Sequence, residues 1–387
     1  MSRIVPAFVL ILCAQIHADA LLPRDENDPY LWLESIESAR SMAWVHAQND
    51  STLAALTPRA PFRELYERNL KVYNSVERIA MPDVHAGYVY NLWKDEAHER
   101  GLWRRTTVDD YTAANPVWEN VLDFDSLSSA EGKEWVFAGA DFLRPSCERC
   151  MLSLSRGGSD AVEIREFDLR TKRFVASGFK LPEAKSGSAW RDANTLLIAS
   201  GLDRDQLTTS GYPRTVKVWK RGTPIESAAP LFAGDTTDMG SWAFSICTTD
   251  REYFLVVRGL TMFKSTVFAL ERGTLVQLDI PVDASLVTIM KGQVILWLKT
   301  DWRVGDRSYA QGALVGVDYD DLLAGRKTIH PIWTPTGLSC IYSVSNTRNL
   351  VILNVLDNVQ GELFECSYRD AAWAARRCAG IRSNRGR

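Results

Sequence analysis

The sequence contains serine, histidine and aspartate, the residue types that hydrolysis needs, but no serine lies in the motif of a catalytic nucleophile. A serine hydrolase of the α/β type places its serine in Gly-x-Ser-x-Gly, because the strained turn that exposes the hydroxyl tolerates only small neighbours. Gly337-Leu338-Ser339 starts this pattern but continues with Cys340-Ile341, and Gly157-Gly158-Ser159 continues with Asp160-Ala161. No other serine fits the motif. We therefore assign no catalytic serine.

Histidine is the usual general base, and four histidines follow residue 20: His46, His85, His98 and His330. The first lies in a predicted helix, the second at the start of a predicted strand, the third in a charged run and the fourth before a proline in a turn. Each position is more typical of a surface or structural residue than of a catalyst. No catalytic residue is predicted.

Metal and cofactor sites are also not predicted. Cys147-x-x-Cys150 has the spacing of a redox pair or half a zinc site, but no second CxxC and no histidine pair accompanies it. A structural disulfide or plain buried thiols explain it better. The acidic pairs Asp109-Asp110 and Asp320-Asp321 fall at predicted turns, where aspartate is favoured for its local backbone hydrogen bonds. A phosphate-binding glycine loop would need a strand–loop–helix context, which is missing.

The elements that surround these residues are mostly short strands. Residues 149–174 alternate polar and apolar residues in two strands and the start of a third, with Gly157-Gly158 as a hairpin turn. The clearest other strands are 87–93, 102–107, 134–137, 195–200, 215–219, 253–257, 265–270, 294–298, 313–317 and 350–355, and 321–325 is predicted as a short helical turn.

A strand that ends in a charged or glycine-containing turn recurs along the chain, at residues 109, 168, 220, 271, 320 and 369. The interval is about fifty residues, which is typical of a β-propeller with four strands in each blade. The sequence therefore predicts an all-β fold, a propeller of about six recognisable blades over residues 78–380. Two amphipathic helices precede it, one over 38–49 and one from Phe62 to Asn74, with Pro61 in the first turn of the second.

The N-terminus predicts export. Arg3 precedes the apolar run 4–14, and Ala18-Asp19-Ala20 has the small-x-small form of a signal-peptidase site. We expect a signal peptide over 1–20, cleavage near Ala20, a helical extension over 21–77 and a periplasmic or secreted protein without a membrane span. Six cysteines then remain, a number that permits disulfides but does not fix their pairing. Residues 381–387 form a polar basic tail.

The composition argues against one class of partner, nucleic acids. The chain has 387 residues, 24% of them charged, and a net charge of −3. This balance argues against a nucleic-acid partner. The segment 100–105 (RGLWRR) combines arginines with a tryptophan, as in some single-strand binding surfaces. Its alternation is better interpreted as a blade strand with solvated arginines.

Several segments resemble one peptidase family. Asp28-Pro29-Tyr30-Leu31-Trp32-Leu33-Glu34, followed by Ala43-Trp44-Val45 and Gln48-Asn49, is similar to the N-terminal signature of the prolyl oligopeptidase family. Further segments resemble an exported bacterial subgroup of this family: 101–105, 152–158, 165–169, 181–186 and 210–214. Together the resemblance extends over about residues 28–380. The serines of 152–158, Ser153 and Ser155, are not nucleophile candidates.

The resemblance implies a seven-bladed propeller that caps an α/β-hydrolase domain, with serine-type cleavage of short peptides, typically after proline. In that family the catalytic triad lies in the C-terminal hydrolase domain, and no position here matches its motifs. We expect an incomplete propeller from a truncated gene, inactive alone, whose missing partner is that hydrolase domain. The alternatives are a non-enzymatic module that binds a peptide or protein, and one half of a split peptidase.

Two structural expectations follow from an incomplete molecule. The helical faces that carry Trp32, Trp44 and Val45 should form an exposed apolar patch, because in the family these helices pack on the hydrolase domain. The blade array should also leave unpaired strand edges near Thr106 and Leu363.

Overall fold

The computed structural model describes residues 28–36, 38–77 and 79–379, which fall into two compact units divided between Ser75 and Val76. The predicted signal peptide (1–20) and polar tail (381–387) lie outside the described residues. Of the helices in the described ranges, none combines the length and the apolar character needed to cross a bilayer.

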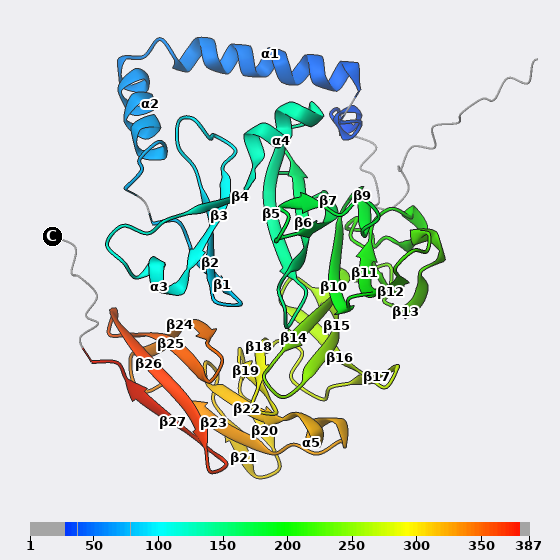
Figure 1. Cartoon of the computed structure of the whole chain (residues 1–387), viewed down its shortest axis with the longest axis vertical. Helices are drawn as coiled ribbons and strands as arrows, with labels where there is room; N and C mark the ends of the chain where they lie inside the picture. Colours follow the sequence, from blue (N-terminus) through cyan, green and yellow to red (C-terminus); the bar gives the residue numbers. More distant parts are fainter. Residues whose placement is uncertain (1–27, 37, 78, 380–387) are drawn as a thin grey trace, which may run out of the picture. The chain divides into compact units, whose positions relative to one another are not determined.

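The N-terminal unit consists of a 3₁₀ helix, Leu31–Glu34, and two α-helices, α1 (Ala39–Leu56) and α2 (Ala60–Tyr73) (Figure 1). Both predicted helices are confirmed, but α1 continues past the predicted end at Asn49 to include Leu53 and Leu56. Asp50, Ser51 and Thr52 do not stop it because they stay exposed to solvent. Pro61 lies in the first turn of α2, where its missing N–H costs no hydrogen bond.

The signature residues of this unit build a small local structure. The Asp28 carboxylate accepts a 2.8 Å hydrogen bond from the Tyr30 N–H, and the Trp32 indole donates to the Pro29 carbonyl at 3.0 Å. Ser41 on α1 donates to the Trp32 carbonyl at 3.1 Å, and the Trp44 ring meets the Trp32 ring edge-on. These contacts fix the 3₁₀ helix on the first turn of α1.

The helices of this unit leave their apolar side chains in solvent. Within its described residues, no hydrophobic side chain of the 3₁₀ helix, α1 or α2 is fully buried. Trp44 and Val45 are exposed, as expected, whereas Trp32 is half-buried, because Arg40 lies over its ring at 4.2 Å. The expected patch is therefore present at Trp44 and Val45 and weaker at Trp32.

The second unit is a β-propeller of six antiparallel sheets, which follow the colour order from cyan to red in Figure 1. We number the sheets 1 to 6 along the chain. Sheet 1 contains β1 (Asp83–His85), β2 (Tyr88–Trp93), β3 (Leu102–Thr107) and β4 (Glu119–Asp123). Sheet 2 contains β5 (Trp135–Phe142), β6 (Arg149–Arg156), β7 (Val162–Asp168), β8 (Arg173–Phe174) and β9 (Lys180–Ala184). Sheet 3 contains β10 (Ser186–Asp192), β11 (Thr195–Ser200), β12 (Thr215–Lys220) and β13 (Ala229–Ala233).

The remaining three sheets repeat this meander. Sheet 4 contains β14 (Gly240–Cys247), β15 (Glu252–Thr261), β16 (Lys264–Glu271) and β17 (Thr274–Gln277). Sheet 5 contains β18 (Ser285–Met290), β19 (Gln293–Trp297), β22 (Leu314–Asp318) and β23 (Ile329–Trp333), with the small ribbon β20 (Trp302–Val304) and β21 (Arg307–Tyr309) inserted after β19. Sheet 6 contains β24 (Ser339–Asn346), β25 (Leu350–Asp357), β26 (Gln360–Arg369) and β27 (Ala372–Arg377).

The repeat markers found in the sequence coincide with one recurring feature. Each of the six positions lies at or just after the end of the third strand of a sheet, where the chain turns toward the fourth. The segment 149–174 is the second, third and fourth strand of sheet 2, and Gly157 and Gly158 form its first turn with φ values of +63° and +86°. The predicted propeller repeat is confirmed.

In the described part of this unit, short α-helices interrupt the sheets at α3 (Val108–Tyr111), α4 (Phe124–Glu131) and α5 (Tyr319–Leu323), and 3₁₀ helices at Arg204–Gln206 and Ile225–Ser227. The helical turn predicted at 321–325 corresponds to α5. Helix α4 was not predicted from the sequence, although its ends carry standard signals. Asp123 accepts hydrogen bonds from the first turn, and Gly132 ends the helix with a φ of +62°.

The core of the propeller lies between successive sheets. Five hydrophobic clusters join sheets 1 and 2, 2 and 3, 3 and 4, 4 and 5, and 5 and 6. The second strand of a sheet sends alternate residues to its two neighbours, since side chains alternate between faces. Leu196 and Ile198 of β11 pack toward sheet 2, and Leu197 and Ala199 pack toward sheet 4. The continuous apolar run of β11 therefore serves two interfaces.

In sheet 6 the alternating side chains of β25 are buried on one face of the strand only. Val351, Leu353 and Val355 of β25 are buried toward sheet 5. The alternate residues Leu350, Ile352 and Leu356 stay half-exposed on the other face.

The strand edges expected near Thr106 and Leu363 are wrong in position. Thr106 lies on β3, which pairs with β2 and β4, and Leu363 lies on β26, which pairs with β25 and β27. Both residues belong to the interior strands of their sheets. The edges fall instead on β1, β4, β24 and β27, because the sequence markers identify the third strand of a sheet and not its outermost one.

Candidate functional site

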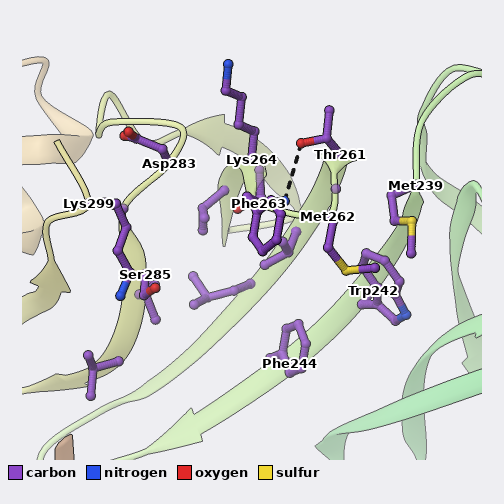
Figure 2. A pocket seen from close by; sticks show the side chains of 18 of the residues that line it. Met239, Trp242, Phe244, Thr261, Met262, Phe263, Lys264, Asp283, Ser285 and Lys299 are labelled. Atoms are coloured by element: carbon purple, nitrogen blue, oxygen red, sulfur yellow. Dashed lines mark hydrogen bonds between the residues drawn. The ribbon is translucent and has the colours of Figure 1, made fainter. Parts of the chain in front are cut away.

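A cavity of about 1000 Å³ lies between sheets 4 and 5 (Figure 2). We call it the inter-sheet groove. It is lined by residues of β14, β15 and β16, by the turn between β15 and β16, and by the segments 283–287 and 299–300. Its volume lies at the upper end of the range for small-molecule sites, and most of its walls are apolar.

Two exposed apolar residues form the turn at the edge of this groove. Met262 and Phe263, which connect β15 to β16, are 70% and 84% exposed. In Figure 2 the Phe263 ring lies over the groove and the Met262 sulfur lies beside Trp242. Phe244, on β14, is 49% exposed and lies on the floor of the same space. A turn with this composition leaves an apolar surface that the rest of sheet 4 does not cover.

Close approach of the backbone holds Trp242 in place. A Cβ on Gly259 would lie 2.8 Å from the Trp242 ring, and one on Gly240 would lie 3.0 Å from it. Only glycine at these two paired positions lets the indole lie flat across β14 and β15. Trp242 therefore forms a fixed wall of the groove.

Few polar groups line the groove. Lys299 is half-buried, and its ammonium lies over the Trp297 ring at 3.2 Å. Burial lowers the pKa of this lysine. Asp283 accepts a 2.8 Å hydrogen bond from Thr300, and Lys264 points away from the cavity in Figure 2. Within the described residues neither Lys299 nor Lys264 has a carboxylate partner within ion-pair distance, and Lys299 is the half-buried one of the two, beside an apolar surface.

A second cavity, of about 360 Å³, lies where β5, β10 and β14 end. Beside it, the Asp141 carboxylate accepts a 3.3 Å hydrogen bond from the Trp190 N–H, and the Asp141 carbonyl accepts a 2.9 Å bond from the Trp190 indole. Burial raises the pKa of Asp141 to about 6. This carboxyl fixes the first strands of sheets 2 and 3 to one another.

The four histidines are separated into different elements. His46 is exposed on α1, and His98 contacts Asp95 at 2.8 Å in the loop after β2. His85 of β1 stacks on Phe142 at 3.8 Å and contacts Asp83 and Arg144, at 2.7 and 2.9 Å. His330, on β23, meets the Tyr368 ring edge-on. No hydrogen bond joins any of them to a serine hydroxyl in the described part of the chain.

The serines of the near-motifs have structural roles. The Ser159 hydroxyl donates to the Ala161 carbonyl at 3.2 Å, and the nearby Ser155 hydroxyl is buried and donates to the Ser159 carbonyl at 2.6 Å. Ser339 accepts a 2.8 Å hydrogen bond from the Thr336 N–H in the turn that precedes β24. In both cases the oxygen is engaged by local backbone.

The thiols of Cys147 and Cys150 are buried in the cluster between sheets 1 and 2 and are not bonded to each other. Burial raises the pKa of both thiols, and the nearby Asp141 and Glu166 carboxylates raise the pKa of Cys150 further. A redox or zinc site needs the thiolate. Of the two explanations offered for this pair, plain buried thiols fit the structure, and the six described cysteines are all free.

The acidic pairs and the arginines of the segment 100–105 have structural roles. Asp109 and Asp110 lie in the first turn of α3, and Asp320 and Asp321 lie in that of α5. Arg104 is sandwiched between Trp93 and Trp118, at 4.2 Å from each ring, and Arg105 pairs with Glu119 at 2.6 Å. The segment 100–105 is a blade strand as interpreted, but its arginines are half-buried rather than solvated.

The described residues contain no cluster of three or more metal-ligating side chains. The inter-sheet groove was also not predicted from the sequence. The signal available for it was Met262-Phe263, two large apolar residues in a position where a strand-to-strand turn usually carries polar ones.

Comparison with known proteins gives a consistent result. A family model described as the prolyl oligopeptidase N-terminal beta-propeller domain matches residues 14–315. The chain is 34% identical over 362 residues to y4nA, an uncharacterized peptidase of Sinorhizobium fredii, and 27% identical over 402 residues to RP174, an uncharacterized peptidase of Rickettsia prowazekii. These alignments cover 91% and 96% of this chain but 50% and 54% of the relatives. The chain spans about half the length of the curated relatives it matches.

Solved structures of oligopeptidases also match this chain. A post-proline cleaving enzyme from Rickettsia typhi is 27% identical, with a TM-score of 0.83, over 90% of this chain and 53% of that enzyme. Oligopeptidase B from Leishmania major, at 12% identity and a TM-score of 0.64 over 90% of this chain and 48% of its own, shares the fold.

Proposed function

Because this chain belongs to the prolyl oligopeptidase family through its N-terminal β-propeller domain, we propose that it is the non-catalytic half of a serine peptidase that cleaves short peptides, typically after proline. The observation that carries this proposal is the combination of two facts. The chain matches half of each peptidase relative, and its own sequence holds no Gly-x-Ser-x-Gly segment.

The proposal assigns the catalytic serine, aspartate and histidine to a hydrolase domain encoded elsewhere, as the family resemblance implies. Two uncovered surfaces support such a partner. Trp44 and Val45 are exposed on α1, and one face of sheet 6 leaves Leu350, Ile352 and Leu356 half-exposed. Apolar surface of this kind is typical of an interaction site.

The direct test is peptidase activity with and without a hydrolase domain. The purified chain is incubated with a fluorogenic proline-containing peptide and with a fluorophosphonate probe, alone and after fusion to the C-terminal half of the Sinorhizobium relative. We expect neither turnover nor labelling for the chain alone, and proline-directed turnover for the fusion. The control is a fusion whose hydrolase-domain serine is replaced by alanine. Stoichiometric fluorophosphonate labelling of the 387-residue chain would contradict the proposal.

The DNA beyond codon 387 distinguishes how the other half is supplied. A continuation that encodes Gly-x-Ser-x-Gly, in phase or frame-shifted, supports a truncated gene. A separate gene for a hydrolase domain supports a split peptidase.

The inter-sheet groove favours a second function, peptide binding without hydrolysis. It offers an apolar surface and the unpaired, half-buried Lys299 in a cavity of suitable size for a short peptide. The two functions separate in the fusion assay, because a binding module gains no turnover from an added hydrolase domain.

The apolar run 4–14 and the Ala18-Asp19-Ala20 site support export, and we propose a periplasmic or secreted protein cleaved near Ala20. N-terminal sequencing of the protein recovered from the periplasm or medium tests this. A mature chain that starts near Leu21 is expected, and an intact residue 1 on protein found inside the cell would contradict it.

A further inference from the structure

The inter-sheet groove combines two features that a peptide can satisfy at once. The geometry points to a binding site for a peptide in which a large apolar residue stands next to a carboxylate. Lys299 binds the carboxylate, and Phe244, Met262 and Phe263 enclose the apolar side chain. This inference rests on the proposed function in one respect, namely that the ligand of the propeller is a peptide.

The apolar half of the site is formed by side chains that the fold leaves uncovered. Phe244 is 49% exposed although it lies on a first strand, and the Phe263 ring lies over the cavity rather than in a core cluster (Figure 2). Large exposed apolar side chains around a concave surface gain free energy when a ligand removes them from water. An apolar side chain of a peptide fits between them, since the cavity of about 1000 Å³ exceeds the volume of one residue several times.

The polar half of the site is the Lys299 ammonium. It lies over the Trp297 ring at 3.2 Å, at the edge of a largely apolar surface, and in Figure 2 it points toward Ser285. Burial lowers its pKa, because no nearby carboxylate compensates the lost hydration. Asp283 lines the same groove but accepts its hydrogen bond from Thr300. A ligand carboxylate near Lys299 restores the missing counter-charge, and the Ser285 hydroxyl offers it a second donor.

Charge complementarity therefore selects among apolar ligands. A neutral apolar peptide gains the contacts with Phe244, Met262 and Phe263 but leaves Lys299 unpaired. An acidic peptide without a large side chain gains the ion pair alone. Adjacent apolar and acidic residues use both parts of the groove.

The experiment measures fluorescence polarisation of dye-labelled short peptide amides on the purified 387-residue chain. The probe contains phenylalanine followed by glutamate, and its two partners carry glutamine for glutamate or alanine for phenylalanine. We expect the probe to bind at least about tenfold more tightly than either partner, because a charge-assisted hydrogen bond and the burial of an aromatic ring each contribute a factor of about ten or more.

Two protein variants locate the binding. Lys299→Met keeps the aliphatic stem and should weaken binding of the glutamate probe about tenfold, while it leaves the glutamine peptide unchanged. Phe263→Ser, at an 84% exposed position that folding does not require, should weaken binding of both phenylalanine peptides. Lys220→Met, at an exposed lysine that ends β12 of sheet 3, is the matched control and should change nothing.

The possible results separate the two proposals. Equal affinity of the three peptides, or a probe affinity that neither Lys299→Met nor Phe263→Ser alters, would overturn this inference. Either result leaves the proposed function standing if the hydrolase fusion is active. Loss of turnover in the fusion together with intact groove-dependent binding would instead overturn the peptidase proposal alone.

Discussion

The indole nitrogen of Trp373 donates a 2.7 Å hydrogen bond to the side-chain oxygen of Gln293, 80 residues earlier in the chain. The bond joins β27 of sheet 6 to β19 of sheet 5, and Gln293 is almost completely buried. Gly316 makes room for it, because a Cβ at that position would lie 2.1 Å from the Gln293 oxygen. A buried polar link thus ties the outermost strand of the last sheet to the interior of its neighbour.

Trp373→Phe should destabilise the protein by about 1–3 kcal/mol, because it leaves the buried Gln293 oxygen without its donor. Urea unfolding monitored by circular dichroism measures this. Adding Gln293→Leu to Trp373→Phe should cost less than the sum of the two single changes, since the pair shares one bond. Trp302→Phe is the control, because its indole nitrogen makes no hydrogen bond within the described residues. Strictly additive effects would contradict the link.

Gln293 also shows what the sequence can predict. The apolar run 294–298 identified β19, and the turn residues identified the repeat, because both are local patterns. The partnership of Gln293 with Trp373 and Gly316 depends on how two sheets meet, and no spacing in the chain encodes that meeting. The groove was missed for the same reason: Phe263 lies in a turn of sheet 4 and Lys299 in the segment after β19 of sheet 5, so only the packed structure brings them to one cavity.

The stability of the protein should depend on pH through Asp141. Its pKa is about 6 in the folded protein because of burial, against 3.8 for an ordinary aspartate. The folded state therefore binds the proton more tightly, and the contribution of Asp141 to the free energy of unfolding falls as the pH rises from about 4 to about 6. The loss is at most about 3 kcal/mol.

Asp141→Asn removes this titration while its amide oxygen can still accept from the Trp190 N–H. Urea unfolding should show the variant more stable than the parent at pH 7.5, and the difference should shrink as the pH approaches 4. Asp306→Asn, at an exposed residue, serves as the control. A difference between Asp141→Asn and the parent that is the same at every pH would show that the carboxyl is not held in its neutral form.

The thiols should react in an order set by burial. Cys340 is exposed, whereas Cys150 and Cys366 are fully buried, and burial raises the pKa of Cys366 to about 12. Iodoacetamide attacks the thiolate, so Cys340 should be alkylated in the native protein and the two buried thiols only after unfolding. Peptide mass spectrometry measures this order. A peptide pair linked through Cys147 and Cys150 would contradict the free-thiol state.

The apolar surface of α2 should bind hydrophobic dyes. Leu65, Tyr66 and Leu70 are exposed on this helix, and their removal creates no cavity. Leu65→Lys combined with Leu70→Lys should lower dye fluorescence and light scattering, while the free energy of unfolding changes by no more than about 0.5 kcal/mol per site. Unchanged dye binding in the variant would show that the dye-binding apolar surface lies elsewhere.

The cores between the sheets also determine the order in which the propeller opens. Releasing sheet 3 disrupts two clusters, whereas releasing sheet 6 disrupts the single cluster with Val351, Leu353 and Val355. In an array where stability comes from nearest neighbours, the element with one covered face has the lowest opening free energy. Amide hydrogens of β25 and β26 therefore exchange with solvent before those of β11, and so do those of β2 and β3, because sheet 1 also shares only one cluster.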